Sequence, residues 1–335
     1  MRFGSHTSID FSVWQQTPLT KMILSLQSRG RGTSMRFSQL RITMYFYRYR
    51  QKVKRSFDNS LRKVKGILRR DRGSISAYWW TGLPNFGDII TPYLLETSRI
   101  TPIFRPVPQA ELACIGSIME YLHRADFRGA IFGTGFSRAD SQVDLSRCQI
   151  RAVRGHLTRK RLGLPETLPV GDPGLLLRHF FKERQQKKYM LGLIPHYNDI
   201  AEHQIQTICK CEPEKIKLID VTAIRKGIVP VLKQIDQCEY VISSSLHGLV
   251  VAEAFDIPTG WAVLTGETGT AGFHGTYKYD DYYSVFETSR KPITLTGEET
   301  LSELIQKTLP PPNRLSLVAD KLLSAWNETL DSLLR

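Results

Sequence analysis

Three consecutive serines and a histidine follow one apolar segment of the chain. Residues 240–253 read Tyr-Val-Ile-Ser-Ser-Ser-Leu-His-Gly-Leu-Val-Val-Ala-Glu, the pattern of a buried strand that ends in hydroxyls and continues into an apolar helix. Ser243, Ser244 and Ser245 can cap that helix, whose free N–H groups and positive end favour a phosphate or carboxylate. His247 can bind such an anion as a cation or transfer a proton, because its unperturbed pKa is about 6.5. The alternative is a serine-capped helix with a packed histidine.

A second polar loop, residues 81–88, follows the first apolar run and leads into another helical pattern. We expect Asn85 and Asp88 to line a cleft there, where Asp88 can accept a proton or a hydrogen bond from a sugar hydroxyl. The alternative is that both residues only cap the helix, while Pro84 and Gly87 shape the turn.

Glycines and an arginine occupy the corresponding place after later strands. Gly133 and Gly135 supply flexible backbone, but the third glycine and the distal acid of a dinucleotide-binding motif are missing, so the sequence does not predict NAD binding. Arg151 and Arg154 flank the start of a predicted helix, where a guanidinium can bind carboxylate or phosphate through two N–H groups. A salt bridge is the alternative role for either arginine.

Further candidates lie at turns in both halves of the chain. Asp172, in Gly-Asp-Pro-Gly, is expected to shape a sharp turn rather than to act in catalysis. His196 follows Ile-Pro at a strand end, which places it at the edge of the same cleft. Lys278 begins the segment 278–282, which follows the Gly-rich residues 266–275 and is expected to move as a lid, with a solvated loop as the alternative.

These residues need strands and helices to position them. From Ser74 onward, short apolar runs alternate with helical patterns, which is typical of βα units and a largely parallel sheet. Strands are predicted at residues 74–80, 112–115, 130–132, 149–153 and 168–170, and after a charged stretch at 189–194, 216–219, 240–243 and 259–263. The sequence therefore predicts an α/β fold of two facing Rossmann-like domains, which bind ligands beyond the carboxyl ends of their strands.

The expected domain boundaries follow from breaks in this pattern. We assign residues 1–73 to a basic N-terminal extension, 74–185 to an N-terminal Rossmann-like domain, 186–312 to a C-terminal Rossmann-like domain and 313–335 to a final helix. Three prolines at 310–312 separate that helix from the domain before it.

Positive charge is concentrated in the predicted extension. The net charge is +14, and residues 1–73 hold 17 Lys and Arg against three acids, whereas the rest of the chain holds 29 of each sign. Residues 1–34 show no periodicity and are expected to be mobile, but Val53, Phe57, Leu61, Val64 and Leu68 recur at helical spacing among basic residues. The charge-balanced remainder argues against a nucleic-acid-binding protein.

The composition also indicates in which compartment the protein works and whether it binds a metal. The five cysteines form no C-x-x-C pair, so neither a disulfide framework nor a zinc ribbon is predicted, and we expect no metal. Neither an apolar run of membrane-spanning length nor a secretory signal pattern is present. We therefore expect a cytoplasmic protein, with the basic helix as a candidate for peripheral contact with an anionic membrane at the inner face of the plasma membrane.

Taken in order, these motifs resemble the polysaccharide pyruvyltransferase family, and most closely its exopolysaccharide members, which form succinoglycan-type pyruvyl ketals. The resemblance covers residues 74–286 and rests on Asn85-Phe-Gly-Asp88, Gly133-Thr-Gly135, Arg154-Gly155, Val170-Gly-Asp-Pro173, Ile194-Pro-His196 and Ser244-Ser-Leu-His247-Gly248. It implies a fold similar to GT-B glycosyltransferases, a phosphoenolpyruvate donor, and a sugar of an oligosaccharide or lipid-linked oligosaccharide as acceptor. The product would be a cyclic pyruvyl ketal, with loss of phosphate.

The resemblance also suggests roles for single residues. His247 is expected to act as acid or phosphate partner, Arg154 as anion clamp and Asp88 as acceptor-side base, without a metal or redox cofactor. Many family members carry Arg where this chain has Ser245, so Arg154 or Lys278 would neutralise more of the donor's charge. The residues expected to bind substrate are Asn85, Gly133, Gly135, His196, Ser243, Ser244, Ser245, Gly248 and Lys278.

One other enzyme class fits the same pattern. A GT-B-type glycosyltransferase that uses a nucleotide sugar would have a similar fold and would also bind phosphate at a helix start. Release of phosphate from phosphoenolpyruvate distinguishes the two activities.

Overall fold

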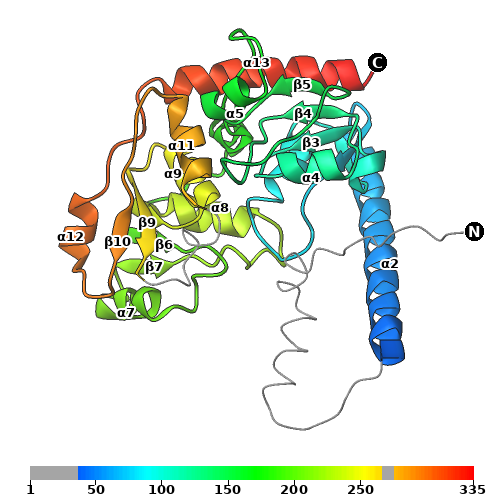
Figure 1. Cartoon of the computed structure of the whole chain (residues 1–335). Helices are drawn as coiled ribbons and strands as arrows, with labels where there is room; N and C mark the ends of the chain where they lie inside the picture. The colour runs from blue at the N-terminus through cyan, green and yellow to red at the C-terminus, as the bar shows by residue number, and fades with distance from the viewer. Residues whose placement is uncertain (1–36, 266–274) are drawn as a thin grey trace, which may run out of the picture. The chain divides into compact units, whose positions relative to one another are not determined.

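The computed structural model of the chain describes residues 37–265 and 275–335, with side chains from residue 53 onward (Figure 1). The segment predicted to be mobile, residues 1–34, lies outside the described residues, as does most of the Gly-rich segment, residues 266–275, that precedes the predicted lid. The described chain has an α/β fold with two parallel five-stranded sheets.

The chain divides into two compact units. The larger consists of residues 59–79 and 84–335 and holds both sheets. The other consists of residues 1–58 and 80–83, and within it Arg55 donates a hydrogen bond of 2.7 Å to Thr81 Oγ1.

The first sheet has the strand order β2-β1-β3-β4-β5, and all neighbouring strands are parallel. Its strands are β1 (Ser74–Tyr78), β2 (Thr101–Phe104), β3 (Leu112–Cys114), β4 (Ala130–Phe132) and β5 (Gln149–Ala152). The sequence did not predict β2, a short edge strand whose Pro102 is tolerated only because one side of the strand is unpaired. The strand predicted at 168–170 is wrong, because only Val170 makes a bridge, to Val153.

The helices of this half begin close to the predicted positions near Gly87, Ser117 and Gly155. They are α3 (Ile90–Thr97), α4 (Met119–Arg124) and α5 (His156–Arg161), followed by α6 (Leu177–Phe180), with two 3-10 turns, η2 (Val107–Gln109) and η3 (Pro173–Leu176).

The second sheet has the order β10-β9-β8-β6-β7 and is also parallel throughout. Its strands are β6 (Tyr189–Ile194), β7 (Ile216–Leu218), β8 (Cys238–Ser243), β9 (Thr259–Leu264) and β10 (Ile293–Leu295). The accompanying helices are α7 (His203–Cys211), α8 (Val229–Asp236), α9 (Leu246–Ala254), α11 (Tyr277–Ser284) and α12 (Leu301–Gln306). The edge strand β10, which directly follows Pro292, was not predicted.

Both sheets have the same order when strands are counted along the chain, with the first strand between the second and the third. In sheets of this order, ligands bind where the order reverses, beyond the carboxyl ends of the first and third strands. In the first sheet that place follows β1 and β3, and in the second it follows β6 and β8. The loops that contain Asn85, Asp88, His196 and the three serines therefore lie at the expected positions.

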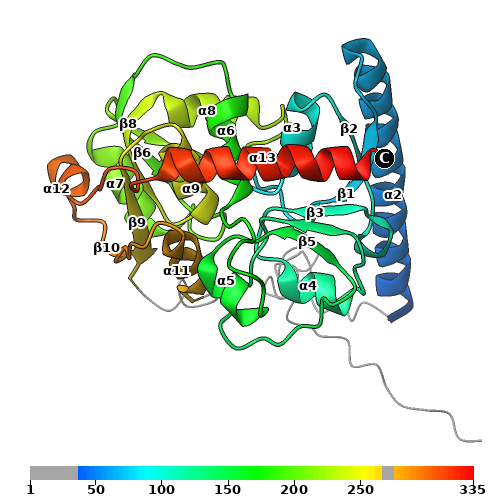
Figure 2. The same ribbon diagram turned by 90° about the horizontal axis from the view of Figure 1, so that it is seen from above.

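The final helix, α13 (Leu315–Leu333), returns from the second sheet to the first (Figure 2). Its Trp326 is fully buried, packs edge-on against Phe132 of β4 at 5.1 Å between ring centroids, and donates a hydrogen bond to Ser98. Leu322 of α13 packs where a side chain at Gly171 would lie. The helix thereby fixes the end of the loop that precedes η3.

The long helix α2 (Phe37–Arg69) includes the predicted basic helical pattern. Its last part lies along the edge strand β2, where the side chain of Asn59 exchanges two hydrogen bonds with the backbone of Phe104. Such a cover protects an edge strand from pairing with another chain. Among the residues that the structure describes, no helix combines the length and the apolar character needed to cross a membrane.

Candidate active site

His247 lies in the first turn of α9 and faces residues of the first half of the chain. It is 9% exposed. A Cβ atom at Gly87 would lie 2.2 Å from His247 Nδ1, so the backbone of the loop after β1 packs directly against the imidazole. Phe86 N donates to Val221 O at 2.8 Å and holds this loop against the second half. The structure therefore brings together two motifs that are about half the chain apart.

The other imidazole nitrogen of His247 faces Asp172. The distance from His247 Nε2 to Asp172 Oδ2 is 3.7 Å, and neither atom has a hydrogen-bond partner among the described residues. Asp172 Oδ1 accepts a hydrogen bond from Gly174 N and caps η3, as the predicted turn role requires. Its second oxygen gives Asp172 a role that sequence reasoning did not assign. The signal was present, because Asp172 follows a strand-like run at the sheet edge that carries the other site residues.

Burial dominates the protonation of this pair. It lowers the pKa of His247 below its usual value, and the charges of Lys278 and Arg154 act in the same direction, whereas Asp172 opposes the shift. Burial raises the pKa of Asp172, against the effects of His247, the Gly174 N–H and Arg154. Because burial opposes charge on both groups, a charged molecule bound beside them would change their protonation.

Lys278 is a buried cation on α11, close enough to Arg154 and Asp199 for their charges to act on it. Burial and the charge of Arg154 lower its pKa to about 8, and Asp199 only partly opposes this shift. Its Nζ lies 5.1 Å from the centroid of the Tyr279 ring, and it makes no ion pair with any carboxylate of the described residues. A buried ammonium without a paired carboxylate is costly in a fold and favours an anionic ligand.

The segment of Lys278 belongs to the largely buried helix α11 and is not a solvated loop. The solvated-loop alternative for residues 278–282 is therefore wrong, whereas movement of this segment as a lid stays a prediction, and residues 266–274 lie outside the described part of the chain. Tyr282 and Tyr283 are buried and donate hydrogen bonds to Glu253 of α9, which fixes α11 against that helix. Tyr279 donates to Ser244 O at 2.7 Å and fixes α11 against the serine loop.

Arg154 is fully buried and links the two halves of the chain. Its Nε donates to Asp281 Oδ2 at 3.0 Å, its Nη1 to Ser117 Oγ and its Nη2 to Phe136 O. Asp281 also accepts from Thr158 N, so a carboxylate of α11 caps the start of α5. Three of the five guanidinium N–H groups therefore have protein partners, and two are left for a further acceptor.

The three serine side chains do not make the helix-capping hydrogen bonds expected of them. Ser245 is the N-cap of α9, but its side chain makes no capping hydrogen bond. The Ser243 hydroxyl bonds Ile194 O, and the Ser244 hydroxyl donates to Asp199 at 2.5 Å. The prediction that these side chains cap the helix is therefore wrong, because Ser245 makes no capping bond and the hydroxyls of Ser243 and Ser244 bond the end of β6 and the loop after it. The first-turn N–H groups of α9 then lack side-chain caps from these serines.

Asp88 lies at the end of the loop after β1. It is half-buried, and burial raises its pKa to about 7, against a hydrogen bond with the side chain of Asn85. Its charge helps to raise the pKa of Tyr197 to about 12, so Asp88 lies near the loop after β6. His196 in that loop is buried, with its ring 4.0 Å from that of Tyr197, and its backbone N–H donates to Ser244. A carboxyl group that titrates near neutrality can act as a general base.

The predicted glycines lie at close-packed positions that support these side chains. A Cβ at Gly133 would lie 2.2 Å from Pro173, which follows Asp172, and Gly133 has a positive φ of 75°. A Cβ at Gly135 would lie 2.6 Å from the Arg154 guanidinium, and one at Gly248 would lie 2.3 Å from Ser243 Oγ. These glycines fix site residues, whereas direct contact of any of them with substrate stays a prediction.

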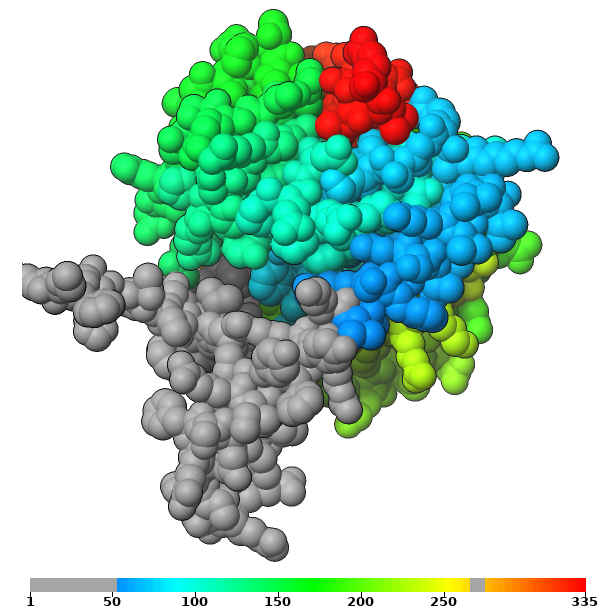
Figure 3. Space-filling view, turned by 90° about the vertical axis from the view of Figure 1, so that its right-hand side faces the viewer, coloured from blue at the N-terminus to red at the C-terminus, as the bar shows by residue number. Residues whose placement is uncertain are grey.

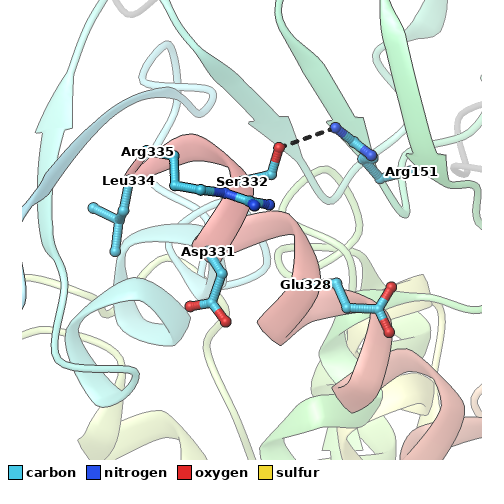
Figure 4. Close-up of a pocket in the computed structure, with 6 residues that line it drawn as sticks. All are labelled: Arg151, Glu328, Asp331, Ser332, Leu334 and Arg335. Atoms are coloured by element: carbon cyan, nitrogen blue, oxygen red, sulfur yellow. Dashed lines mark hydrogen bonds between the residues drawn. The ribbon is translucent and has the colours of Figure 1, made fainter.

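A separate hollow of about 590 Å³ lies at the C-terminal end of α13 (Figure 4). Its lining residues are Arg151, Glu328, Asp331, Ser332, Leu334 and Arg335. Arg151 donates there to Ser332 at 3.2 Å, and the lining holds two arginines and two carboxylates. The hollow contains none of the site residues described above.

Comparison with known proteins gives one family and two relatives. The family model described as polysaccharide pyruvyl transferase matches residues 43–261. The chain is 25% identical over 220 residues to the succinoglycan biosynthesis protein ExoV of Rhizobium meliloti (strain 1021). This alignment covers 64% of this chain and 66% of that protein. It is 33% identical over 167 residues to the uncharacterized protein L143 of Acanthamoeba polyphaga mimivirus. This alignment covers 48% of this chain and 55% of that protein.

Proposed function

Because the chain belongs to the polysaccharide pyruvyl transferase family, we propose that it transfers the pyruvyl group of phosphoenolpyruvate to a sugar of an exopolysaccharide or of its lipid-linked precursor. The sugar receives a cyclic ketal and phosphate is released. The observation that carries this proposal is the buried Lys278, a cation without a carboxylate ion pair among the described residues, in the same site as His247 and the start of α9. The name of the ExoV relative supports the same class of acceptor.

Phosphoenolpyruvate carries a carboxylate and a phosphate within a few bonds of each other. Lys278 can neutralise one of them, and the two unused N–H groups of Arg154 and the first-turn N–H groups of α9 can donate to the other. Lys278, Arg154 and the N–H groups of α9 would together take the place of the arginine that many family members carry at the position of Ser245. The arrangement also accounts for the cost of burying Lys278, since the bound anion would offset it.

The reaction requires one proton donor and one proton acceptor. A proton added to the methylene carbon of phosphoenolpyruvate creates an oxocarbenium-like centre, which one sugar hydroxyl attacks. Phosphate then leaves with cleavage of its bond to that carbon, and a second hydroxyl closes the ketal. The two sugar hydroxyls lose one proton each. One of these protons replaces the proton that was added to the methylene carbon, and the other leaves with phosphate.

We assign the donor role to His247 and the acceptor role to Asp88. Asp172 would orient His247 Nε2 and stabilise its protonated form, so that Nδ1, on the side of Gly87, serves the substrate. Asp88, with its pKa near 7, would accept the proton of the attacking hydroxyl. The two groups come from opposite halves of the chain, as in the two facing Rossmann-like domains of a GT-B-like arrangement.

The test is phosphate release by the purified full-length protein. Phosphoenolpyruvate is supplied with oligosaccharides from exopolysaccharides whose ketals have been removed by mild acid, and UDP-glucose replaces it in a parallel reaction. The proposal predicts phosphate and a ketal-bearing product from phosphoenolpyruvate, no sugar transfer from UDP-glucose, and loss of activity in His247→Ala. Glycosyl transfer from UDP-glucose, without phosphate release from phosphoenolpyruvate, would instead establish a nucleotide-sugar transferase.

A further inference from the structure

The C-terminal part of α2 contacts the protein through its polar face. Asn59 bonds the backbone of β2, and a Cβ atom at Gly66 would lie 1.8 Å from Thr101 Oγ1. Arg62 lies 5.0 Å from the centroid of the Trp79 ring and 3.8 Å from Glu96, and Arg69 pairs with Asp71 at 2.7 Å. The inward positions recur every three or four residues, so one face of the helix is fully used.

The apolar residues of the same helix lie on the opposite face, in solvent. Leu61 is 44% exposed, Val64 56%, Ile67 76% and Leu68 78%. By helical spacing Val53 and Phe57 extend this row, and they are 50% and 63% exposed. We call these six residues the apolar stripe. Figure 3 shows this part of the chain, in blue, at the surface. An amphipathic helix that only packed on its own domain would bury this face instead.

Basic residues border the apolar stripe. At 100° per residue, Lys54 and Lys65 lie along one border and Lys63 along the other, and all three are exposed. Between Val53 and Arg70 the sequence contains one acid, the half-buried Asp58, which lies just outside the border formed by Lys54 and Lys65. A basic border beside apolar side chains matches a surface that is apolar inside and negatively charged outside.

We propose that the apolar stripe inserts into the surface of an anionic lipid bilayer, with the three lysines at the lipid headgroups. A second copy of the chain would bring like charges together along both borders, which disfavours self-association through this face. The inference goes beyond the proposed function and uses none of the active-site residues, so either can fail without the other.

Vesicle co-sedimentation of the full-length protein tests the proposal. The vesicles are phosphatidylcholine alone or phosphatidylcholine with phosphatidylserine, at low and high salt. The variant Leu61→Glu/Ile67→Glu/Leu68→Glu removes half of the apolar stripe, and Lys54→Gln/Lys63→Gln/Lys65→Gln removes the charges that border it. Leu317→Glu is the matched control, since Leu317 is 49% exposed on α13. Thermal unfolding verifies that the variants remain folded, which the exposure of the replaced side chains favours.

The wild type and Leu317→Glu should bind the anionic vesicles, and salt should weaken this binding. At about 1 kcal/mol for each basic residue near the surface, the lysine variant should bind roughly a hundredfold more weakly. The stripe variant should not sediment with either vesicle. Equal binding by the stripe variant and the wild type would overturn the proposal. So would a wild-type dimer that the stripe substitutions dissociate, because the stripe would then be covered by a second copy.

Discussion

His247 Nε2 and Asp172 Oδ2 face each other at 3.7 Å, and neither atom has a hydrogen-bond partner among the described residues. This distance is longer than a hydrogen bond, but catalytic hydrogen bonds often tighten only in the substrate complex. A carboxylate in this position fixes the imidazole tautomer and stabilises the imidazolium. We therefore propose this pair as the proton-transfer unit of the site.

The first prediction concerns Asp172→Asn. The amide oxygen can still accept from Gly174 N, so the turn should survive, but the negative charge beside His247 is lost. We expect kcat to fall roughly a hundredfold or more, with little change in KM for phosphoenolpyruvate. Steady-state kinetics measure both, and Asp256→Asn, at an exposed ion pair, is the control. A near-normal kcat in Asp172→Asn would remove Asp172 from the mechanism.

The second prediction concerns the stability cost of Lys278. Its pKa falls from 10.5 to about 8 on folding, which corresponds to a cost of ~3 kcal/mol when the lysine is charged in both states. That cost is full below about pH 8 and disappears as the pH rises toward 10.5. Lys278→Met should therefore raise the free energy of unfolding at neutral pH and lose this advantage in alkali. Denaturant unfolding at neutral pH and at about pH 10.5 measures the free energy of unfolding, with Lys321→Met at an exposed position as control. Equal stability of Lys278→Met and the wild type at neutral pH would contradict the account.

The third prediction is a bell-shaped dependence of kcat/KM on pH, with its optimum below pH 7. In the active form His247 carries a proton and Asp88 does not, although burial lowers the pKa of His247 and raises that of Asp88 to about 7. Activity should therefore rise through the lowered pKa of His247, fall above about pH 7, and fall further as Lys278 loses its proton near pH 8. Asp88→Asn should reduce kcat and remove the loss of activity on the acidic side. Retention of the full acidic limb in that variant would show that another group is the base.

The fourth prediction separates the structural role of Arg154 from its charge. A lysine cannot reach Asp281, Ser117 and Phe136 O together, so Arg154→Lys should destabilise the fold by ~2–4 kcal/mol. Chemical denaturation measures the loss, and Arg178→Lys at a surface ion pair should change stability by less than ~1 kcal/mol. If both variants are equally stable, the link between the two halves does not depend on the guanidinium.

The sequence predicted the elements that carry their own local signal. The apolar runs of β6 and β8 and the helical spacing of α13 are such cases, and they lie close to the predicted positions. The short edge strands β2 and β10 were missed, because Pro102 lies within β2 and Pro292 directly precedes β10, and a proline argues against a strand.

The sequence predicted which loops form the site, but it did not predict which of their side chains pair with each other. The serine-histidine segment and the loop with Asp88 follow strands, so topology alone places them at the same edges. Arg154 and Asp281 are 127 residues apart, and only tertiary packing determines that they pair. Asp172 was read as a turn residue because one of its oxygens does form the turn, and the partner of the other oxygen is on a different sheet's helix.

The central claim is that the buried cation on α11 binds the phosphoenolpyruvate donor beside His247. Isothermal titration of phosphoenolpyruvate into the full-length protein tests it without any knowledge of the acceptor. The account predicts that the wild type and Lys321→Met bind, and that Lys278→Met binds roughly tenfold to a hundredfold more weakly. Binding of phosphoenolpyruvate by Lys278→Met with unchanged affinity, in a folded protein, would contradict the account.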